Sequence, residues 1–135
     1  MLRLVIDTNV LISSFFGGNP KKVIDLWREG RAILCVTQGV LEEYLRVIAR
    51  LPIAPESKNK LVAILQEKSN IELVNPSRHY SLIREDPEDN KFIDCAIEAQ
   101  ADYIISGDAH LLQVKAYRGI AIYSPKDFLQ MIINP

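Results

Sequence analysis

Two acidic residues stand at or shortly after the ends of short apolar runs, where their carboxylates could bind a ligand. Leu4-Val5-Ile6 leads into Asp7, and Tyr103-Ile104-Ile105 is followed by a tight turn and Asp108. Such runs predict strands buried on both faces of a sheet. Open α/β sheets bind ligands beyond the carboxyl ends of their strands, so two neighbouring strands would bring these carboxylates together. Taken singly, a helix cap explains Asp7 and a turn explains Asp108.

Acids in two predicted helices are further candidates for the same edge. Glu42 and Glu43 stand within residues 40–48, whose apolar spacing predicts a helix, and the acidic segment 86–90 precedes another helix. Each group also has a purely structural explanation. Arginines lie at helical spacing from both glutamates, and carboxylates favour the N-terminal end of a helix. Only the joint placement of the four groups points to function.

Four carboxylates at one sheet edge would form a site for a divalent cation. Like charges at short distance raise each other's pKa, and a cation removes that cost. Oxygen ligands favour Mg²⁺ or Mn²⁺. The 2 cysteines and 2 histidines have no spacing typical of a zinc site.

The composition predicts one compact domain, residues 1–135, in the cytoplasm. Of the 135 residues 48% are hydrophobic, yet no apolar run is long enough to cross a membrane and no signal-peptide pattern precedes the first strand. Cys35 and Cys95 stand in apolar segments and are expected to be buried free thiols. The net charge of −1 lacks the basic footprint of a protein that coats nucleic acid. It does not exclude an enzyme in which metal ions supply the positive charge at a phosphate.

Alternating strands and helices must position these acids. We expect strands at residues 4–6, 32–36, 71–74, 103–105 and 120–123. Amphipathic helices separate them, and Ser124-Pro125 begins the last helix. This alternation predicts a single α/β/α sandwich around a parallel, doubly wound sheet.

The pattern of residues 5–11, 41–47, 86–92 and 101–112 is shared with a known family. In order and spacing these segments resemble PIN domains, and more narrowly the VapC-like toxins of prokaryotic toxin–antitoxin systems. The resemblance extends over nearly the whole chain. It implies a five-stranded parallel sheet of order 3-2-1-4-5 and an endoribonuclease site that depends on one or two Mg²⁺ or Mn²⁺ ions.

The resemblance assigns the catalytic, metal-binding carboxylates to Asp7, Glu43, Asp89 and Asp108. Glu42 stays an alternative to Glu43. Asp94 is a further candidate ligand, although it lies roughly 140° around the helix from Asp89 at about 100° per residue.

The same resemblance implies supporting residues and partners. Ser106 takes the place of the family hydroxyl beside the site, and Asn9 is expected to brace Asp7 by a hydrogen bond. RNA is the implied substrate. An antitoxin protein that masks the site and a second copy of the chain are the implied partners, with no membrane involved.

Two other functions of doubly wound sheets stay open. A phosphatase-like phosphohydrolase requires a second carboxylate two residues after the first, and this position is Asn9. A non-catalytic, receiver-like binding or adaptor module needs a phosphoacceptor after the third strand, where Asn75-Pro76 stands. Because neither pattern is complete, a metal-dependent ribonuclease is the leading hypothesis.

Overall fold

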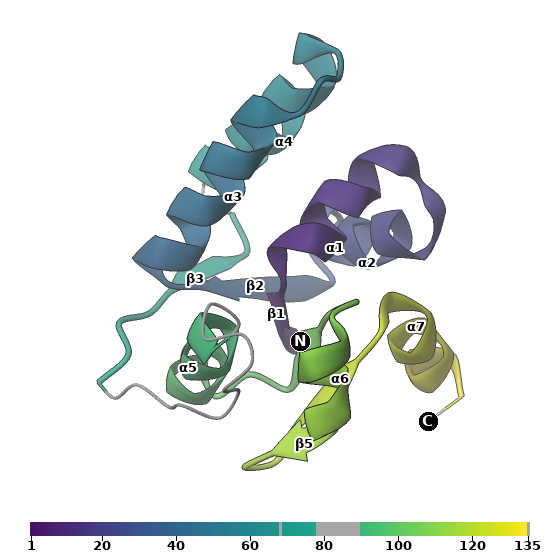
Figure 1. Ribbon diagram of the computed structural model, residues 1–135. Helices are drawn as coiled ribbons and strands as arrows, with labels where there is room; N and C mark the ends of the chain where they lie inside the picture. The colour runs from purple at the N-terminus through teal and green to yellow at the C-terminus, as the bar shows by residue number, and fades with distance from the viewer. Residues whose placement is uncertain (68, 78–89, 135) are drawn as a thin grey trace.

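A central sheet organises the computed structural model, which describes residues 1–67, 69–77 and 90–134 (Figure 1). Its strands are β1 (Leu2–Ile6), β2 (Ala32–Val36), β3 (Ile71–Leu73), β4 (Tyr103–Ile105), β5 (Ala116–Tyr117) and β6 (Ile120–Tyr123). They lie in the order β3-β2-β1-β4-β6-β5. All pairs are parallel except β5 with β6. The five expected strands therefore take the predicted order, and the predicted α/β class is confirmed.

The short strand β5 is an addition that the sequence pattern did not predict. Arg118 and Gly119 join it to β6 with φ angles of 51° and 81°. Positive φ at both central residues is what a tight two-residue hairpin turn requires. Because β5 has only two residues, it is too short to show an apolar period.

The middle of the sheet aligns the two strand ends that carry the acids. β1 lies between β2 and β4, and Ile6 pairs with Ile105. The backbone N–H of Asp7 continues this ladder by donating to the Ile105 carbonyl over 3.0 Å. Leu4, Val5 and Ile6 are fully buried, as expected for a central strand covered on both faces. The chain therefore leaves β1 and β4 at the same edge.

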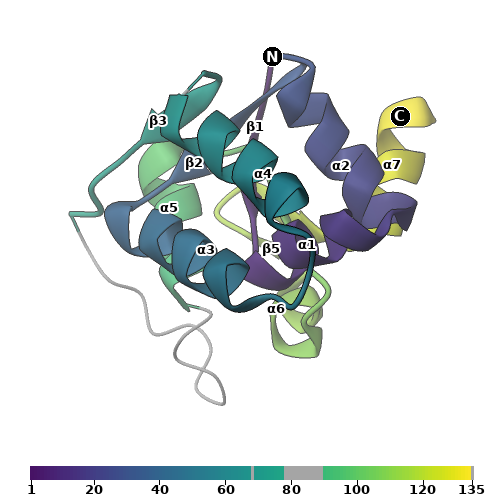
Figure 2. The ribbon, with the colours of Figure 1, turned by 90° about the horizontal axis from the view of Figure 1, so that it is seen from above.

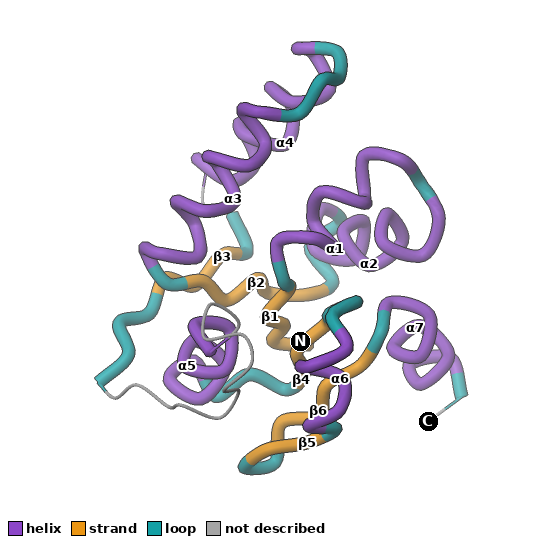
Figure 3. The backbone as a smooth tube through the Cα atoms, in the orientation of Figure 1, coloured by secondary structure: helices purple, strands orange, loops and turns teal. Residues whose placement is uncertain are grey.

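Helices cover both faces of this sheet (Figures 1 and 3). They are α1 (Thr8–Ser13), the 3₁₀ turn η1 (Ser14–Phe16), α2 (Gly18–Arg28), α3 (Gln38–Arg50), α4 (Pro55–Glu67), α5 (Asn90–Ala99), α6 (Ala109–Val114) and α7 (Pro125–Ile133). On one face α1 contacts α2 and α3, and α2 contacts α7. On the other face α5 packs against β1, β2 and β4.

Helices α3 and α4 form an antiparallel pair that extends beyond the sheet (Figures 1 and 2). The Lys58 ammonium group joins the pair by donating to the carbonyls of Ala49 and Leu51 over 3.3 and 3.1 Å. A cation at this place also interacts favourably with the C-terminal end of α3. Across the described residues, no helix has the length and apolar character that crossing a bilayer demands.

Candidate active site

Asp7 is both a helix cap and a buried acid. It is the N-cap of α1, where its Oδ1 accepts the backbone N–H of Val10 over 2.9 Å. Its other oxygen, Oδ2, accepts the hydroxyl of Ser106. Only 3% of the residue is exposed. The two explanations of Asp7 therefore do not compete, because capping uses one carboxylate oxygen and leaves the other facing β4.

Ser106 links Asp7 to Asp108. The fully buried serine donates its hydroxyl to Asp7, and the same oxygen accepts the backbone N–H of Asp108 over 2.9 Å. Asp108 is in turn the N-cap of α6, and its Oδ1 accepts the backbone N–H groups of His110 and Leu111. The Ser106 hydroxyl thus connects the Asp7 carboxylate to the backbone of Asp108 at the carboxyl edge of the sheet, while the Asp108 carboxylate caps α6.

Glu43, rather than Glu42, faces this edge. Its carboxylate accepts the hydroxyl of Thr8, the residue after Asp7, and forms an ion pair with the Lys91 ammonium of α5. Glu42 is exposed and accepts from the side chain of Gln38 over 3.1 Å. Of the two adjacent glutamates, the one on the inner side of α3 is therefore Glu43.

Tyr44 fixes the height of α3 against the sheet. Its fully buried phenol donates to the carbonyl of Ile6, the last residue of β1. Thr37 caps the same helix by accepting the Val40 N–H over 3.1 Å. These two bonds hold the glutamate-bearing turn of α3 beside the end of β1.

Opposite forces act on the pKa values of Asp7 and Glu43. Burial raises the pKa of Asp7, and hydrogen bonds from Ser106, Val10 and Gly107 offset this only in part while the charge of Asp108 adds to it. Burial also raises the pKa of Glu43, but the hydrogen bonds and charge of Lys91, with help from Thr8, bring its net pKa below the ordinary value. Among the described residues, the negative charge of Asp7 is therefore not offset by a neighbouring cation, whereas that of Glu43 is offset by Lys91.

The two remaining acids lie on or before α5. Asp89 lies outside the residues that the structure describes. Asp94 is buried, at 6% exposure, and lines a pocket of about 290 Å³ with Thr37, Asn75 and Lys91. Asp94 therefore shares a pocket with the partner of Glu43, on the β2–β3 side of the edge.

Most side-chain groups at this edge offer oxygen atoms, which are the ligands that a hard divalent cation prefers. Within residues 1–67, 69–77 and 90–134, however, no three acidic, His or Cys side chains come close enough to hold a metal ion. Of the predicted residues, Asp7, Ser106 and Asp108 form one hydrogen-bonded chain, Glu43 pairs with Lys91, and Asp94 lines the pocket beside that pair. The contribution of Asp89 to a ligand set stays a prediction.

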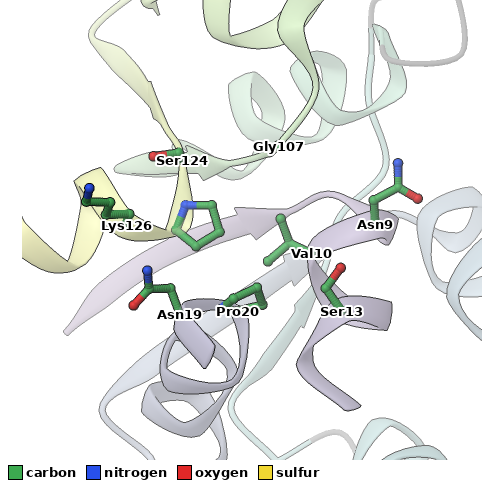
Figure 4. A pocket seen from close by; sticks show the side chains of 9 residues that line it. Asn9, Val10, Ser13, Asn19, Pro20, Gly107, Ser124 and Lys126 are labelled. Carbon is green, nitrogen blue, oxygen red and sulfur yellow. The ribbon is translucent and has the colours of Figure 1, made fainter. Parts of the chain in front are cut away.

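The expected hydrogen bond from Asn9 to Asp7 does not form. Asn9 is exposed and, with Val10, Ser13, Asn19 and Gly107, lines a pocket of about 310 Å³ (Figure 4). Asn9 is the second residue of α1 and is exposed, whereas Asp7 is buried. The bonds that orient Asp7 come from Val10 and Ser106 instead.

Thr8, Tyr44 and Lys91 were not singled out by the sequence pattern. Each makes a polar contact that positions Glu43 or its helix. The sequence positions of two of them could have indicated such a role. Thr8 is adjacent to the strand-end acid, and Tyr44 is on the apolar stripe of its helix. Lys91 follows an acidic cluster, where a lysine is usually taken as a surface charge.

Comparisons with known proteins agree on the family and the fold. A family model described as a PIN domain matches residues 3–110. An uncharacterized protein of Methanocaldococcus jannaschii is 29% identical over 142 residues, which cover 96% of this chain and 90% of that protein.

Three solved structures share the fold at low sequence identity. VapBC2 of Rickettsia felis, solved bound to a DNA fragment from its promoter, has 13% identity and a TM-score of 0.58 over 90% of this chain and 97% of that one. FitAcB of Neisseria gonorrhoeae has 17% identity and a TM-score of 0.57, over 91% and 98%. The PIN domain of human SMG5 has 18% identity and a TM-score of 0.54, over 96% and 98%. With a family model that spans most of its length, the chain belongs to the PIN domain family.

Proposed function

We propose that this PIN domain is a divalent-metal-dependent endoribonuclease. The observation that carries the proposal is the buried Asp7 carboxylate, bonded through the Ser106 hydroxyl to the backbone N–H of Asp108, at the ends of two neighbouring parallel strands. Ligands of open α/β sheets lie at this edge. Nuclease activity is general in the family, which supports a hydrolase that acts on phosphodiester bonds.

The chain's own residues supply binding groups and their orientation. Asp7 and Asp108 would hold the cation, and Glu43 and Asp89 would complete the ligand set, with Asp94 as a further candidate. When bound, one or two Mg²⁺ or Mn²⁺ ions supply an activated water and neutralise charge at the phosphate and the leaving oxygen. Ser106 and the Val10 N–H hold the Asp7 carboxylate in one orientation, so that little reorganisation accompanies binding.

The substrate and partners follow from the family resemblance. We propose single-stranded RNA as the substrate, in a reducing compartment such as the cytoplasm, which suits the two buried free thiols. We further propose a VapC-like role in which an antitoxin protein masks the acidic edge. The likeness in fold to VapBC2 and FitAcB supports that choice. A second copy of the chain is a further candidate partner.

Cleavage of a fluorescent single-stranded RNA tests the proposal. We expect cleavage with Mn²⁺ or Mg²⁺, none with a chelator, and a loss of about a hundredfold or more for Asp7→Asn. Asp127→Asn, an exposed aspartate of α7, is the matched control and should cleave like the original protein. Undiminished cleavage by Asp7→Asn, or in the presence of the chelator, would remove the carboxylates from the mechanism.

A further inference from the structure

The pocket beside the acidic edge combines apolar walls with polar side chains. Asn19 and Pro20, at the start of α2, face Ser124 and Lys126, at the start of α7, and Val10 lies to one side (Figure 4). The walls combine proline rings and a valine with amide and hydroxyl groups on the rim. Flipped bases are held in this way, between apolar surfaces that cover the ring and polar groups that bond its edge.

The pocket differs in charge from the acidic edge next to it. None of the nine described residues that line it is acidic, and Lys126 adds a cation at the N-terminal end of α7, where the helix dipole is also positive. Gly107 lines the pocket and connects Ser106 to Asp108 along the chain. A polyanion that reaches the carboxylates would therefore find an adjoining surface without acidic side chains here.

The size of the pocket limits its occupant. At about 310 Å³ it is at the lower end of the roughly 300–1,000 Å³ range of small-molecule sites. That volume suits one nucleotide better than a helix or a peptide segment, which would need a long groove. Amide groups such as that of Asn19 pair with base edges through one donor and one acceptor.

We propose that this pocket holds one unpaired base of the RNA strand, next to the phosphate that is cleaved. Asn19 bonds the edge of the base, the rings of Pro20 and Pro125 cover its faces, and Lys126 binds the adjoining phosphate. The inference rests on the proposed ribonuclease function and adds the source of its sequence preference.

Nucleotide binding tests the pocket without any cleavage. The four ribonucleoside 5′-monophosphates are titrated separately into the ¹⁵N-labelled full chain, and amide peaks are followed by NMR. We expect at least one nucleotide to shift the side-chain amides of Asn9 and Asn19, and Asn19→Ala to weaken its binding by about fivefold or more. Asn59→Ala, an exposed asparagine of α4, is the matched control and should bind like the original protein.

Cleavage of a randomised single-stranded RNA pool tests the place of the pocket. We expect a base preference at one position flanking the cut, and a fall of about fivefold or more in that preference for Asn19→Ala. Lys126→Ala should weaken binding equally for all bases and lower the salt slope by about one, whereas Lys60→Ala on α4 should not.

The outcomes separate this inference from the proposed function. Cleavage with a base preference that Asn19→Ala leaves unchanged overturns the nucleobase site and leaves the ribonuclease intact. Asn19-dependent nucleotide binding in a chain that cleaves no RNA overturns the ribonuclease and keeps the nucleotide site. Pocket variants that change self-association in sedimentation, but not nucleotide binding, would make the pocket a protein interface and overturn the inference.

Discussion

At the level of single residues, the acidic edge combines one acid that the fold destabilises with one that it stabilises. Asp7 is almost fully buried beside Asp108, whereas Glu43 pairs with Lys91. Carboxylates that repel one another are common at cation sites, because the bound cation removes the electrostatic repulsion that destabilises the protein without it. The contributions of Asp7 and Glu43 to the free energy of unfolding should therefore change with pH in opposite directions.

Asp7→Asn should increase the stability of the metal-free protein at neutral pH. Because the folded pKa of Asp7 is raised, the folded state binds more protons, and its penalty is present above that pKa and absent below the ordinary value of 3.8. The asparagine keeps an oxygen for the Val10 N–H and can donate its amide to Ser106. Urea unfolding with a chelator across a range of pH measures the difference. A variant less stable than the original protein at neutral pH would contradict the expectation.

Glu43→Gln should decrease stability at neutral pH by about 1 kcal/mol, because it removes a half-buried ion pair. The lowered pKa of Glu43 contributes stability above its ordinary value of 4.5, and this contribution is lost as pH falls through the folded pKa. The difference between variant and original protein should therefore shrink in acid. Glu42→Gln in the neighbouring exposed position is the control, measured by the same unfolding curves. Equal effects of the two substitutions would contradict the assignment of Glu43.

At the level of elements, α3 carries Glu43 and depends on its cap. The Thr37 hydroxyl accepts the Val40 N–H at the start of the helix, and Thr37→Ala should cost about 1 kcal/mol. Thr37→Ser keeps the hydroxyl and should restore most of the loss. Unfolding by urea with circular dichroism at helical wavelengths measures both variants. A loss in Thr37→Ser as large as in Thr37→Ala would mean that the methyl group, and not the cap, is responsible.

The same elements show what could be predicted from the sequence. The buried strands were accessible from the sequence, because short apolar runs alternate with amphipathic helices. Their order came from the family resemblance and matches the structure. β5 and the direction of Asn9 were not, since a two-residue strand has no period and a residue at the start of a helix can face either way. The choice of Glu43 came from the family resemblance, and its partner Lys91 comes from a different helix that no local pattern connects to it.

At the level of the whole molecule, two thiols report whether the core is closed. Cys35 in β2 and Cys95 in α5 are fully buried, and burial raises their pKa values to about 11 and about 12. Both are therefore protonated at neutral pH, and thiols in that state are poor nucleophiles. We expect iodoacetamide to label both cysteines only slowly in the native protein and rapidly after unfolding in urea, as measured by mass spectrometry. Rapid labelling of either cysteine under native conditions would contradict this.

Slow labelling of these thiols also gives a measure of metal binding that needs no RNA. A ligand that binds only the folded state stabilises it by RT ln(1 + [L]/Kd), or roughly 2.7 kcal/mol at a hundred times Kd. If the core opens and closes faster than it reacts, Mn²⁺ at that concentration should slow labelling about a hundredfold. Asp7→Asn should lose most of this protection, because it removes a buried carboxylate from the edge that would hold the ion. Asp127→Asn should keep it. Equal protection of all three proteins would place the bound ion elsewhere on the molecule, even if the RNA were still cleaved.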